Sequence, residues 1–271
     1  MQANTAASIF ETFHALSDEA WTRLVVASAS ADDPRLPGFP EPEVQLRLNG
    51  QPASGSLPLG VRFYGLTKQR IEAALGPIHP GLRVLDFGAG WGRIFRLWQK
   101  DIAPENLFAC DVSELMDSFW PDAFPGARFM RNAARPPLPD ALKDLDVIYA
   151  HSVFSHLPPD LADAWITAFA ERLKPNGLVI LTTFHLETMA KWGELIGDAP
   201  YAVVHRTMHQ DRAAIAARLA RGEMVYYELA PNWGNALIPR DYMARWDRFD
   251  LLDYTEEGYP QAIATLQLKD A

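Results

Sequence analysis

Cysteine is almost absent from this sequence, since Cys110 is the only one among 271 residues. No disulfide can form within the chain, which excludes the disulfide-stapled scaffolds of small secreted domains. Cys110 ends the apolar run Leu107–Cys110, so we expect a buried thiol that packs like a small hydrophobic side chain. A thiol of this kind suits a reducing compartment.

Long hydrophobic runs are also missing. No apolar stretch approaches the roughly 20 residues that span a bilayer. The first residues lack the basic start and unbroken apolar stretch of a secretory signal, because Glu11, His14, Asp18 and Glu19 interrupt them. We therefore expect no membrane partner and a cytoplasmic location.

Positive charge is scarce: 25 Lys and Arg stand against 34 Asp and Glu, which gives a formal net charge of −9. This balance argues against a surface that neutralises nucleic-acid phosphates. The best candidate for a basic face is residues 205–221, with Arg206, Arg212, Arg218 and Arg221, and a solvated helix face explains it more simply. A small molecule or a peptide is the expected partner, and nucleic acid is not.

Apolar residues make up 48% of the chain, enough for a sizeable core, and the length favours one large α/β domain with additions. Residues 6–16 and 18–29 are predicted to be helices, the second with Ser17 as its N-cap. Residues 33–59 are rich in Pro and Gly and predict an irregular segment. We therefore treat residues 1–65 as an N-terminal helical and Pro-rich extension, which we expect to form part of the acceptor pocket or a lid.

From Leu66 onward, strands alternate with helices. A helix is predicted over 67–75 and another near Trp91, and short apolar runs predict strands at 83–86, 107–110, 127–130, 145–150 and 177–184. Continuous apolar strands between helices are typical of a parallel sheet covered on both faces. Residues 66–271 therefore predict a Rossmann-like α/β domain.

The C-terminal part differs from this pattern. Residues 248–254 and 262–268 predict two strands joined by a short turn, which forces an antiparallel pair. Between the fifth strand and this hairpin lies an aromatic-rich insertion, residues 186–246. Long insertions at the strand ends of an α/β sheet usually shape a binding site.

A glycine-rich loop follows the first predicted strand, with Gly88, Gly90 and Gly92 at alternate positions and Asp86 two residues before them. The dinucleotide fingerprint needs two residues between its second and third glycines, so the third glycine is misplaced for NAD. Asp86 would repel a pyrophosphate, whereas its carboxylate can hold the ammonium end of a zwitterionic ligand. A methionine-type cofactor fits this loop better.

Asp111 directly follows the second predicted strand. A short carboxylate there can accept hydrogen bonds from both hydroxyls of a ribose, about where α/β nucleotide sites place such an acid. The alternative is structural: Asp111 would cap a helix that begins near Ser113.

The sequence from Val84 to Arg93 resembles the first motif of the class I S-adenosylmethionine-dependent methyltransferases. Residues 110–113 resemble the ribose motif of that family, residues 146–157 its fourth strand and following loop, and residues 172–177 the turn into its fifth strand. The likeness covers about residues 66–184, and the terminal hairpin matches the last two strands of the family.

The resemblance implies a seven-stranded, mostly parallel sheet of order 3-2-1-4-5-7-6 with an antiparallel C-terminal hairpin. It implies S-adenosyl-L-methionine as cofactor and S-adenosyl-L-homocysteine as product. Where the family often has an acid after the third strand, this chain has Asn132. The cofactor contacts that the resemblance implies are Tyr64, Asp86, Gly88, Ala89, Gly90, Arg93, Asp111, Val112, Asn132, Ala133, His151 and Ser152.

Two histidines follow the fourth predicted strand. His151 is expected at the crevice, where an imidazole can remove a proton from an acceptor, and the alternative is a residue that only packs beside the cofactor. His156 is expected to organise the loop before Pro158. Aromatic residues at 64, 192, 226, 227 and 233 suggest an acceptor pocket, although core packing would explain each of them. No cluster of residues has a convincing spacing for a metal site, although His205 and His209 stand four residues apart, a spacing that can bind zinc on a helix.

These patterns favour methyl transfer to an oxygen, nitrogen or carbon of a small-molecule acceptor, with His151 as the catalytic residue. An aminopropyl transferase of the same fold would need acids around its acceptor, and residues 151–154 supply none. A non-catalytic binding partner or regulator is a further alternative, because fold does not guarantee activity. The sequence leaves the oligomeric state and the acceptor open.

Overall fold

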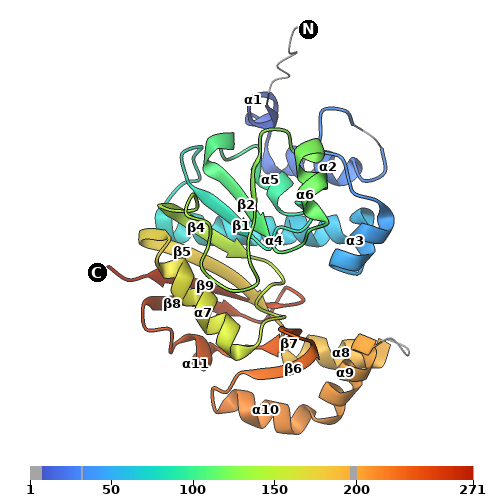
Figure 1. Ribbon diagram of the computed structural model, residues 1–271, viewed down its shortest axis with the longest axis vertical. Coiled ribbons are helices and arrows are strands. Elements are labelled where there is room, and N and C mark those ends of the chain that lie inside the picture. Colours follow the sequence, from blue (N-terminus) through green and yellow to red (C-terminus); the bar gives the residue numbers. More distant parts are fainter. Residues whose placement is uncertain (1–7, 32, 196–199, 271) are drawn as a thin grey trace. The chain divides into compact units, whose positions relative to one another are not determined.

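The computed structural model describes residues 8–31, 33–195 and 200–270, which form both helices and strands (Figure 1). The described residues form two compact units. The first contains the residues up to Asn132 together with Leu145–Val147, and the second contains Ala133–Asp144 and the residues from Ile148 onward.

Seven strands form one sheet in the order β3-β2-β1-β4-β5-β9-β8, and β6 and β7 form a separate two-stranded sheet. Strand β2 is parallel to β1 and to β3, whereas β9 is antiparallel to β5 and to β8. The predicted fold class, including the strand order and the antiparallel C-terminal pair, is confirmed. The strands are β1 (Val84–Phe87), β2 (Leu107–Asp111), β3 (Arg128–Arg131), β4 (Leu145–Ala150), β5 (Leu173–Thr183), β6 (Val225–Ala230), β7 (Trp233–Leu237), β8 (Phe249–Thr255) and β9 (Ala262–Leu268).

Helices α2 and α3 pack against α4 in the first unit, and α5 contacts both α2 and α4 (Figure 1). Every residue of β1, β2 and α5 is buried, which explains the unbroken apolar runs in the sequence. The helices of this unit are α1 (Ile9–Phe13), α2 (Asp18–Ala27), α3 (Pro42–Asn49), α4 (Ala53–Leu75), α5 (Phe95–Trp98) and α6 (Met116–Ala123), with a 3-10 turn at Pro104–Asn106.

The irregular segment predicted over residues 33–59 is partly wrong, because α3 and the first turns of α4 lie within it. Pro42 occupies the first turn of α3, where a missing N–H costs nothing. Pro58 lies inside α4, and the buried side chains of Leu57 and Phe63 on that helix offset the lost hydrogen bond. Helix α4 runs without a break through residue 65. The division of the chain at that residue stays a prediction.

The second unit combines α7, β5, β8 and β9 with the inserted hairpin β6–β7, around which α8, α9 and α10 gather (Figure 1). Phe184, Met189, Met208, Ile215 and Val225 form the apolar centre of this insertion together with Leu237. Its helices are α7 (Pro159–Ala170), α8 (Leu186–Leu195), α9 (Pro200–Gln210), α10 (Arg212–Ala220) and α11 (Arg240–Met243).

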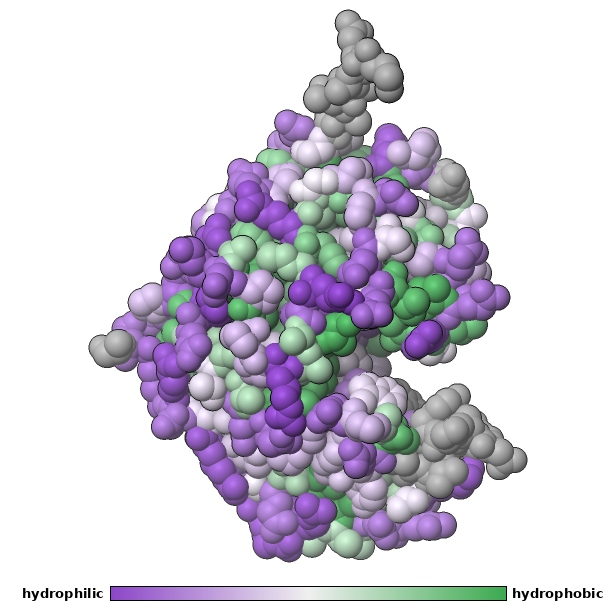
Figure 2. Space-filling view, in the orientation of Figure 1, coloured by the Kyte–Doolittle hydropathy of each residue, from purple (hydrophilic) through white to green (hydrophobic). Residues whose placement is uncertain are grey.

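Three of the four arginines of the predicted basic face have acidic partners. Arg212 pairs with Glu187, and Arg218 and Arg221 both pair with Glu223. The surface around α10 is hydrophilic, whereas an apolar patch lies over α3, where Leu46 is 49% exposed (Figure 2). No helix within the described ranges has both the length and the hydropathy to cross a membrane.

Candidate cofactor and acceptor site

The glycine loop between β1 and α5 depends on a left-handed backbone. Gly88, Gly90 and Gly92 have φ angles of 76°, 51° and 76°, a region that side chains other than glycine rarely adopt. The amides of Gly88 and Ala89 donate to the carbonyl oxygen of Cys110 on the neighbouring strand, at 2.9 and 3.0 Å. The end of β2 therefore fixes the start of the loop.

The second and third glycines serve different purposes. A Cβ added at Gly92 would lie 2.5 Å from the ring of Phe124, so this glycine lets α6 approach the loop. A Cβ added at Gly90 would meet no protein atom within 4 Å. Gly92 is thus required for packing, whereas Gly90 borders open space.

Asp111 at the end of β2 is tied to the glycine loop. One carboxylate oxygen accepts a hydrogen bond from the amide of Gly90 at 2.7 Å, and the other accepts one from the amide of Ser113 at 2.8 Å. Burial raises the pKa of Asp111, and these backbone hydrogen bonds oppose the rise. Helix α6 begins at Met116 with Leu115 as its N-cap, so Asp111 does not cap that helix.

Asp86, Asn132 and Val112 are further predicted cofactor contacts. Each is near the glycine loop or near Asp111, either in the sequence or through a hydrogen bond. Asp86 of β1 is 2% exposed, two residues before Gly88. The amide of Asn132 donates to the carbonyl oxygen of Asp111 at 3.1 Å, which brings the end of β3 beside the end of β2. Val112 is 54% exposed, so protein leaves its apolar side chain uncovered, whereas Ala133 is exposed and belongs to the second unit.

Tyr64 and Arg93 were predicted contacts outside the glycine and ribose motifs. Tyr64 on α4 is buried, its ring packs edge-on against Trp98, and its hydroxyl donates to Asp101. It thus belongs to a cluster of ion pairs in which Lys68 binds Asp101. Arg93 contacts the carbonyl oxygen of Ser56 on α4 at 3.4 Å. Nothing in these contacts points to a ligand, and both assignments stay predictions.

Arg96 is a buried cation that the sequence does not single out. It is 1% exposed, and its guanidinium donates to the carbonyl oxygens of Gly92, Pro37 and Gly38 at 3.0–3.3 Å. It also lies over the ring of Phe39 at 4.2 Å. Burial lowers its pKa to about 9, so it remains charged at neutral pH. Arg96 therefore joins the Pro-rich segment to the glycine loop.

In the second unit, a polar cluster surrounds the residues after β4. His151 is 8% exposed, and its Nε2 lies 2.6 Å from the hydroxyl of Tyr259. The amide of Ser152, which has a φ of 59°, donates to Oγ1 of Thr182 at 2.7 Å. Gln261 donates to Oγ of Ser152 at 3.0 Å and accepts from Thr182 at 2.5 Å. Two residues just before β9 thus hold the loop that carries His151.

Sequence reasoning missed Tyr259 and Gln261. Tyr259 lies 108 residues after His151, and neither belongs to a local motif. A signal was present only in the predicted order of the strands, since the residues that precede the last strand lie close to the end of the fifth. That proximity gives no indication of which side chain would reach His151.

His156 holds the loop to the inserted hairpin. Its Nδ1 donates to the carbonyl oxygen of Gly234 at 2.8 Å, and its ring stacks on Trp233 with centroids 4.9 Å apart. Amides of β7 donate back to the carbonyl oxygens of His156 and Ser155. Burial lowers the pKa of His156 to about 4, so the ring stays neutral at pH 7. These contacts suit an organising role.

The remaining aromatic candidates do not form one group. Val225, Leu237 and Tyr227 share the apolar centre of the insertion, and the hydroxyl of Tyr227 donates to Asp211. Tyr226 points to the opposite face of β6, because successive strand residues alternate. Trp192 lies on α8, and its side chain is outside the described residues.

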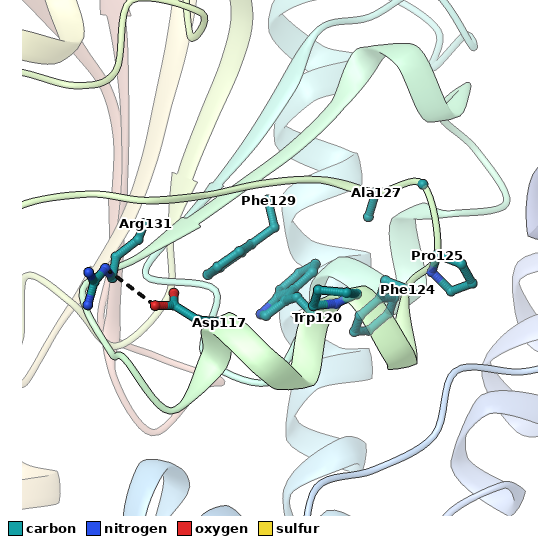
Figure 3. Close-up of a pocket in the computed structure, with 9 residues that line it drawn as sticks. Asp117, Trp120, Phe124, Pro125, Ala127, Phe129 and Arg131 are labelled. Carbon is teal, nitrogen blue, oxygen red and sulfur yellow. Dashed lines mark ion pairs between the residues drawn. The ribbon is translucent and has the colours of Figure 1, made fainter.

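A pocket of about 530 Å³ opens between α6 and β3 (Figure 3). Trp120 and Phe129 stack face to face with ring centroids 4.7 Å apart, and Asp117 and Arg131 form an ion pair at one end. None of the residues predicted to contact the cofactor lines it. Its link to the loop is indirect, through Trp120, whose indole N–H donates to the carbonyl oxygen of Gly90.

Residues 85–179, which run from β1 into β5, match the model of a methyltransferase domain family. Over these residues the chain is similar to a methyltransferase domain. The matched residues of the methyltransferase domain include the glycine loop, Asp111 and His151. No curated protein sequence matches the chain.

Solved structures of methyltransferases share the fold of this domain. CalS10, an amino pentose methyltransferase from Micromonospora echinaspora, is 13% identical with a TM-score of 0.53, and the match covers 86% of this chain and 98% of CalS10. A methyltransferase from Anabaena variabilis is 12% identical with a TM-score of 0.53, covering 93% and 95%. The magnesium protoporphyrin IX methyltransferase from Synechocystis is 16% identical with a TM-score of 0.51, covering 84% and 94%.

Proposed function

We propose that this methyltransferase domain transfers a methyl group from S-adenosylmethionine to an oxygen, nitrogen or carbon of a small-molecule acceptor. The observation that carries the proposal is the tie between Asp111 and Gly90, which places a carboxylate beside a glycine loop that borders open space. A loop and an acid in this arrangement suit a ligand with an amino acid end and a ribose.

The residues of the first unit fit this cofactor. Asp86 would hold the ammonium group, and the open side of Gly90 would leave room for the methionine part. Asp111 would accept from the ribose hydroxyls, since each of its oxygens has a lone pair beyond the one used by a backbone amide. Val112 would pack on the adenine, and Asn132 would lie near the adenine amino group. When bound, S-adenosylmethionine supplies a methyl group on a positively charged sulfur.

His151 and Ser152 belong to the second unit, and we propose that they face the acceptor side of the reaction. A neutral imidazole can take a proton from the acceptor as the new bond forms. Positioning would supply most of the remaining rate enhancement. The acceptor classes named for CalS10 and the magnesium protoporphyrin enzyme, an amino pentose and a porphyrin, support a small-molecule acceptor. The extension (1–65) and the insertion (186–246) are proposed to set the specificity.

An aminopropyl transferase is the nearest rival enzyme. Its polyamine acceptor would need acids close to the loop after β4, whereas the side chains of Tyr259, Gln261 and Thr182, which bond to that loop, are uncharged. A non-catalytic binding protein is the other rival. A cytoplasmic location is proposed because the single cysteine of the chain, Cys110, is a free and buried thiol.

The test has two steps. Calorimetry with S-adenosylmethionine and S-adenosylhomocysteine measures binding, and NAD serves as the control ligand that should give no heat. Mass spectrometry then detects methylated products after incubation with a panel of small hydroxyl, amine and carbon acceptors. Binding without any product would favour the non-catalytic alternative, and a lack of binding would refute the proposed function.

A further inference from the structure

The hydroxyl of Tyr259 and Nε2 of His151 form a hydrogen bond of 2.6 Å. A phenol O–H is the stronger acid of the two neutral groups, and an imidazole nitrogen is the stronger base. The hydroxyl of Tyr259 therefore donates to Nε2 of His151, and the imidazole carries its own proton on Nδ1.

This assignment changes which side chain meets the acceptor. The basic nitrogen of His151 is covered by the Tyr259 hydroxyl, so a proton bound for Nε2 passes through that oxygen. We propose that Tyr259 is the catalytic residue that takes the proton of the acceptor, while His151 receives the proton that Tyr259 gives up. The proposal rests on the proposed methyl transfer and goes beyond it by naming the proton path.

The proposed step is balanced without any further reactant. The bond between the acceptor atom and its hydrogen breaks, and that proton moves to the oxygen of Tyr259. The original phenolic proton moves to Nε2 of His151, which becomes an imidazolium. The acceptor's electron pair forms the new bond to the methyl carbon, and the electron pair of the sulfur–methyl bond stays on sulfur, which becomes a neutral thioether.

The surroundings of the pair hold it in place. Tyr259 is 5% exposed, and its ring meets the His151 ring edge-on with centroids 5.9 Å apart. Gln261, two residues after Tyr259, bonds to Ser152, the residue after His151. The hydrogen bond between Gln261 and Ser152 therefore fixes the backbone one or two residues from His151 and from Tyr259. A proton relay needs this kind of preorganisation, because both transfers occur while the acceptor attacks.

The first test reads the tautomer of His151 by ¹⁵N NMR at neutral pH, without cofactor or acceptor. The signal of His151 among the seven histidines is identified by its loss in His151→Asn. We expect the Nδ1–H tautomer in the wild type and a changed tautomer ratio in Tyr259→Phe, which keeps the ring. Tyr254→Phe is the matched control, since it removes a half-buried phenol that donates to the carbonyl oxygen of Ile238, and it should leave the His151 signal unchanged.

An Nε2–H tautomer in the wild type, or the same tautomer ratio in Tyr259→Phe, would overturn the proposal. The second test uses an acceptor from the product screen. Tyr259→Phe should lower kcat by about 10²–10⁴-fold with unchanged affinity for S-adenosylhomocysteine, and the double variant with His151→Asn should be no slower than the slower single variant. Wild-type turnover in Tyr259→Phe would also overturn it. Failure to bind S-adenosylmethionine would refute the proposed function alone, because the NMR test needs no ligand.

Discussion

Alanine substitutions at Gly90 and Gly92 should distinguish a glycine that leaves room for a ligand from a glycine that allows close packing. Both glycines have positive φ angles, so each alanine carries a backbone cost of roughly 1–2 kcal/mol. At Gly92 the new Cβ would also lie 2.5 Å from Phe124, and overpacking of this kind costs about 1–3 kcal/mol more. Gly92→Ala should therefore lose about 2–5 kcal/mol of stability, and Gly90→Ala about 1–2.

Ligand affinity should change in the opposite order, with the larger loss in Gly90→Ala. The Cβ at Gly90 would occupy the open space proposed for the methionine part of the cofactor, so Gly90→Ala should weaken binding of S-adenosylhomocysteine by about 10–100-fold, the equivalent of roughly 1–3 kcal/mol of overpacking. Gly90→Val should abolish binding. Any loss of affinity in Gly92→Ala should follow from its lower stability.

Two measurements decide between these outcomes. Urea unfolding followed by circular dichroism gives the free energy of unfolding of each variant, and calorimetry gives its affinity for S-adenosylhomocysteine. Wild-type affinity in Gly90→Ala would show that the ligand does not pass this glycine, which would remove the observation that carries the proposed function. Equal stability of the two variants would refute the packing explanation for Gly92.

Three further predictions follow from single contacts. Asp111→Ala should weaken binding of S-adenosylmethionine by roughly 1–3 kcal/mol, and unchanged affinity in calorimetry would remove Asp111 from the site. The pKa of His156 falls from 6.5 to about 4 on folding, so the free energy of unfolding should decrease by up to about 3 kcal/mol as the pH falls across this range and stay level above it. His156→Asn should flatten that dependence in urea titrations, and an unchanged slope would contradict the assignment. Arg96→Met should speed limited proteolysis near Pro37 with an unchanged circular dichroism spectrum, whereas a wild-type cleavage rate would count against the anchoring role.

Strands β1, β2, β4, β5 and β9 were predictable from the sequence because most of their residues are buried. The predicted spans 145–150 and 262–268 coincide with β4 and β9, and the other five strands of the large sheet begin or end within a few residues of their predictions. An unbroken apolar run leaves few alternatives when both faces of a sheet are covered. Helix α2 could also be predicted from the sequence, because Ser17 is a typical N-cap residue. Its side chain accepts a hydrogen bond from the amide of Ala20.

The inserted hairpin was not predictable in the same way. In strand β6 only Val225 is buried and the other residues are half-buried or exposed, and β7 begins after a turn in which Asn232 adopts a φ of 61°. Such a short pair is not stable alone and depends on its contacts with the loop after β4 and with α9 and α10. Those contacts join residues about 80 positions apart, such as His156 and Gly234, and no local pattern encodes them.

The candidate site likewise contains residues that local motifs predict and residues that depend on long-range contacts. The glycine loop and Asp111 lie in contiguous motifs, so their chemistry could be interpreted locally, and the hydrogen bond between Gly90 and Asp111 follows from the pairing of β1 with β2. The roles of Gly92 and Tyr259 could not be inferred, because each depends on one distant aromatic side chain. Phe124 determines the first and His151 the second.

The N-terminal extension completes the core beneath the glycine loop. The indole N–H of Trp21 on α2 donates to the carbonyl oxygen of Leu97 on α5 at 2.8 Å, within the buried interior. One residue earlier on α5, Arg96 bonds the carbonyl oxygens of Pro37 and Gly92 at once. Buried carbonyls need donors, and a buried guanidinium needs acceptors, so neither side can separate without leaving polar groups unpaired. A lid that opened by moving the segment around Pro37 would leave those groups unpaired beside the glycine loop, so we expect this segment to support the loop and to stay in place.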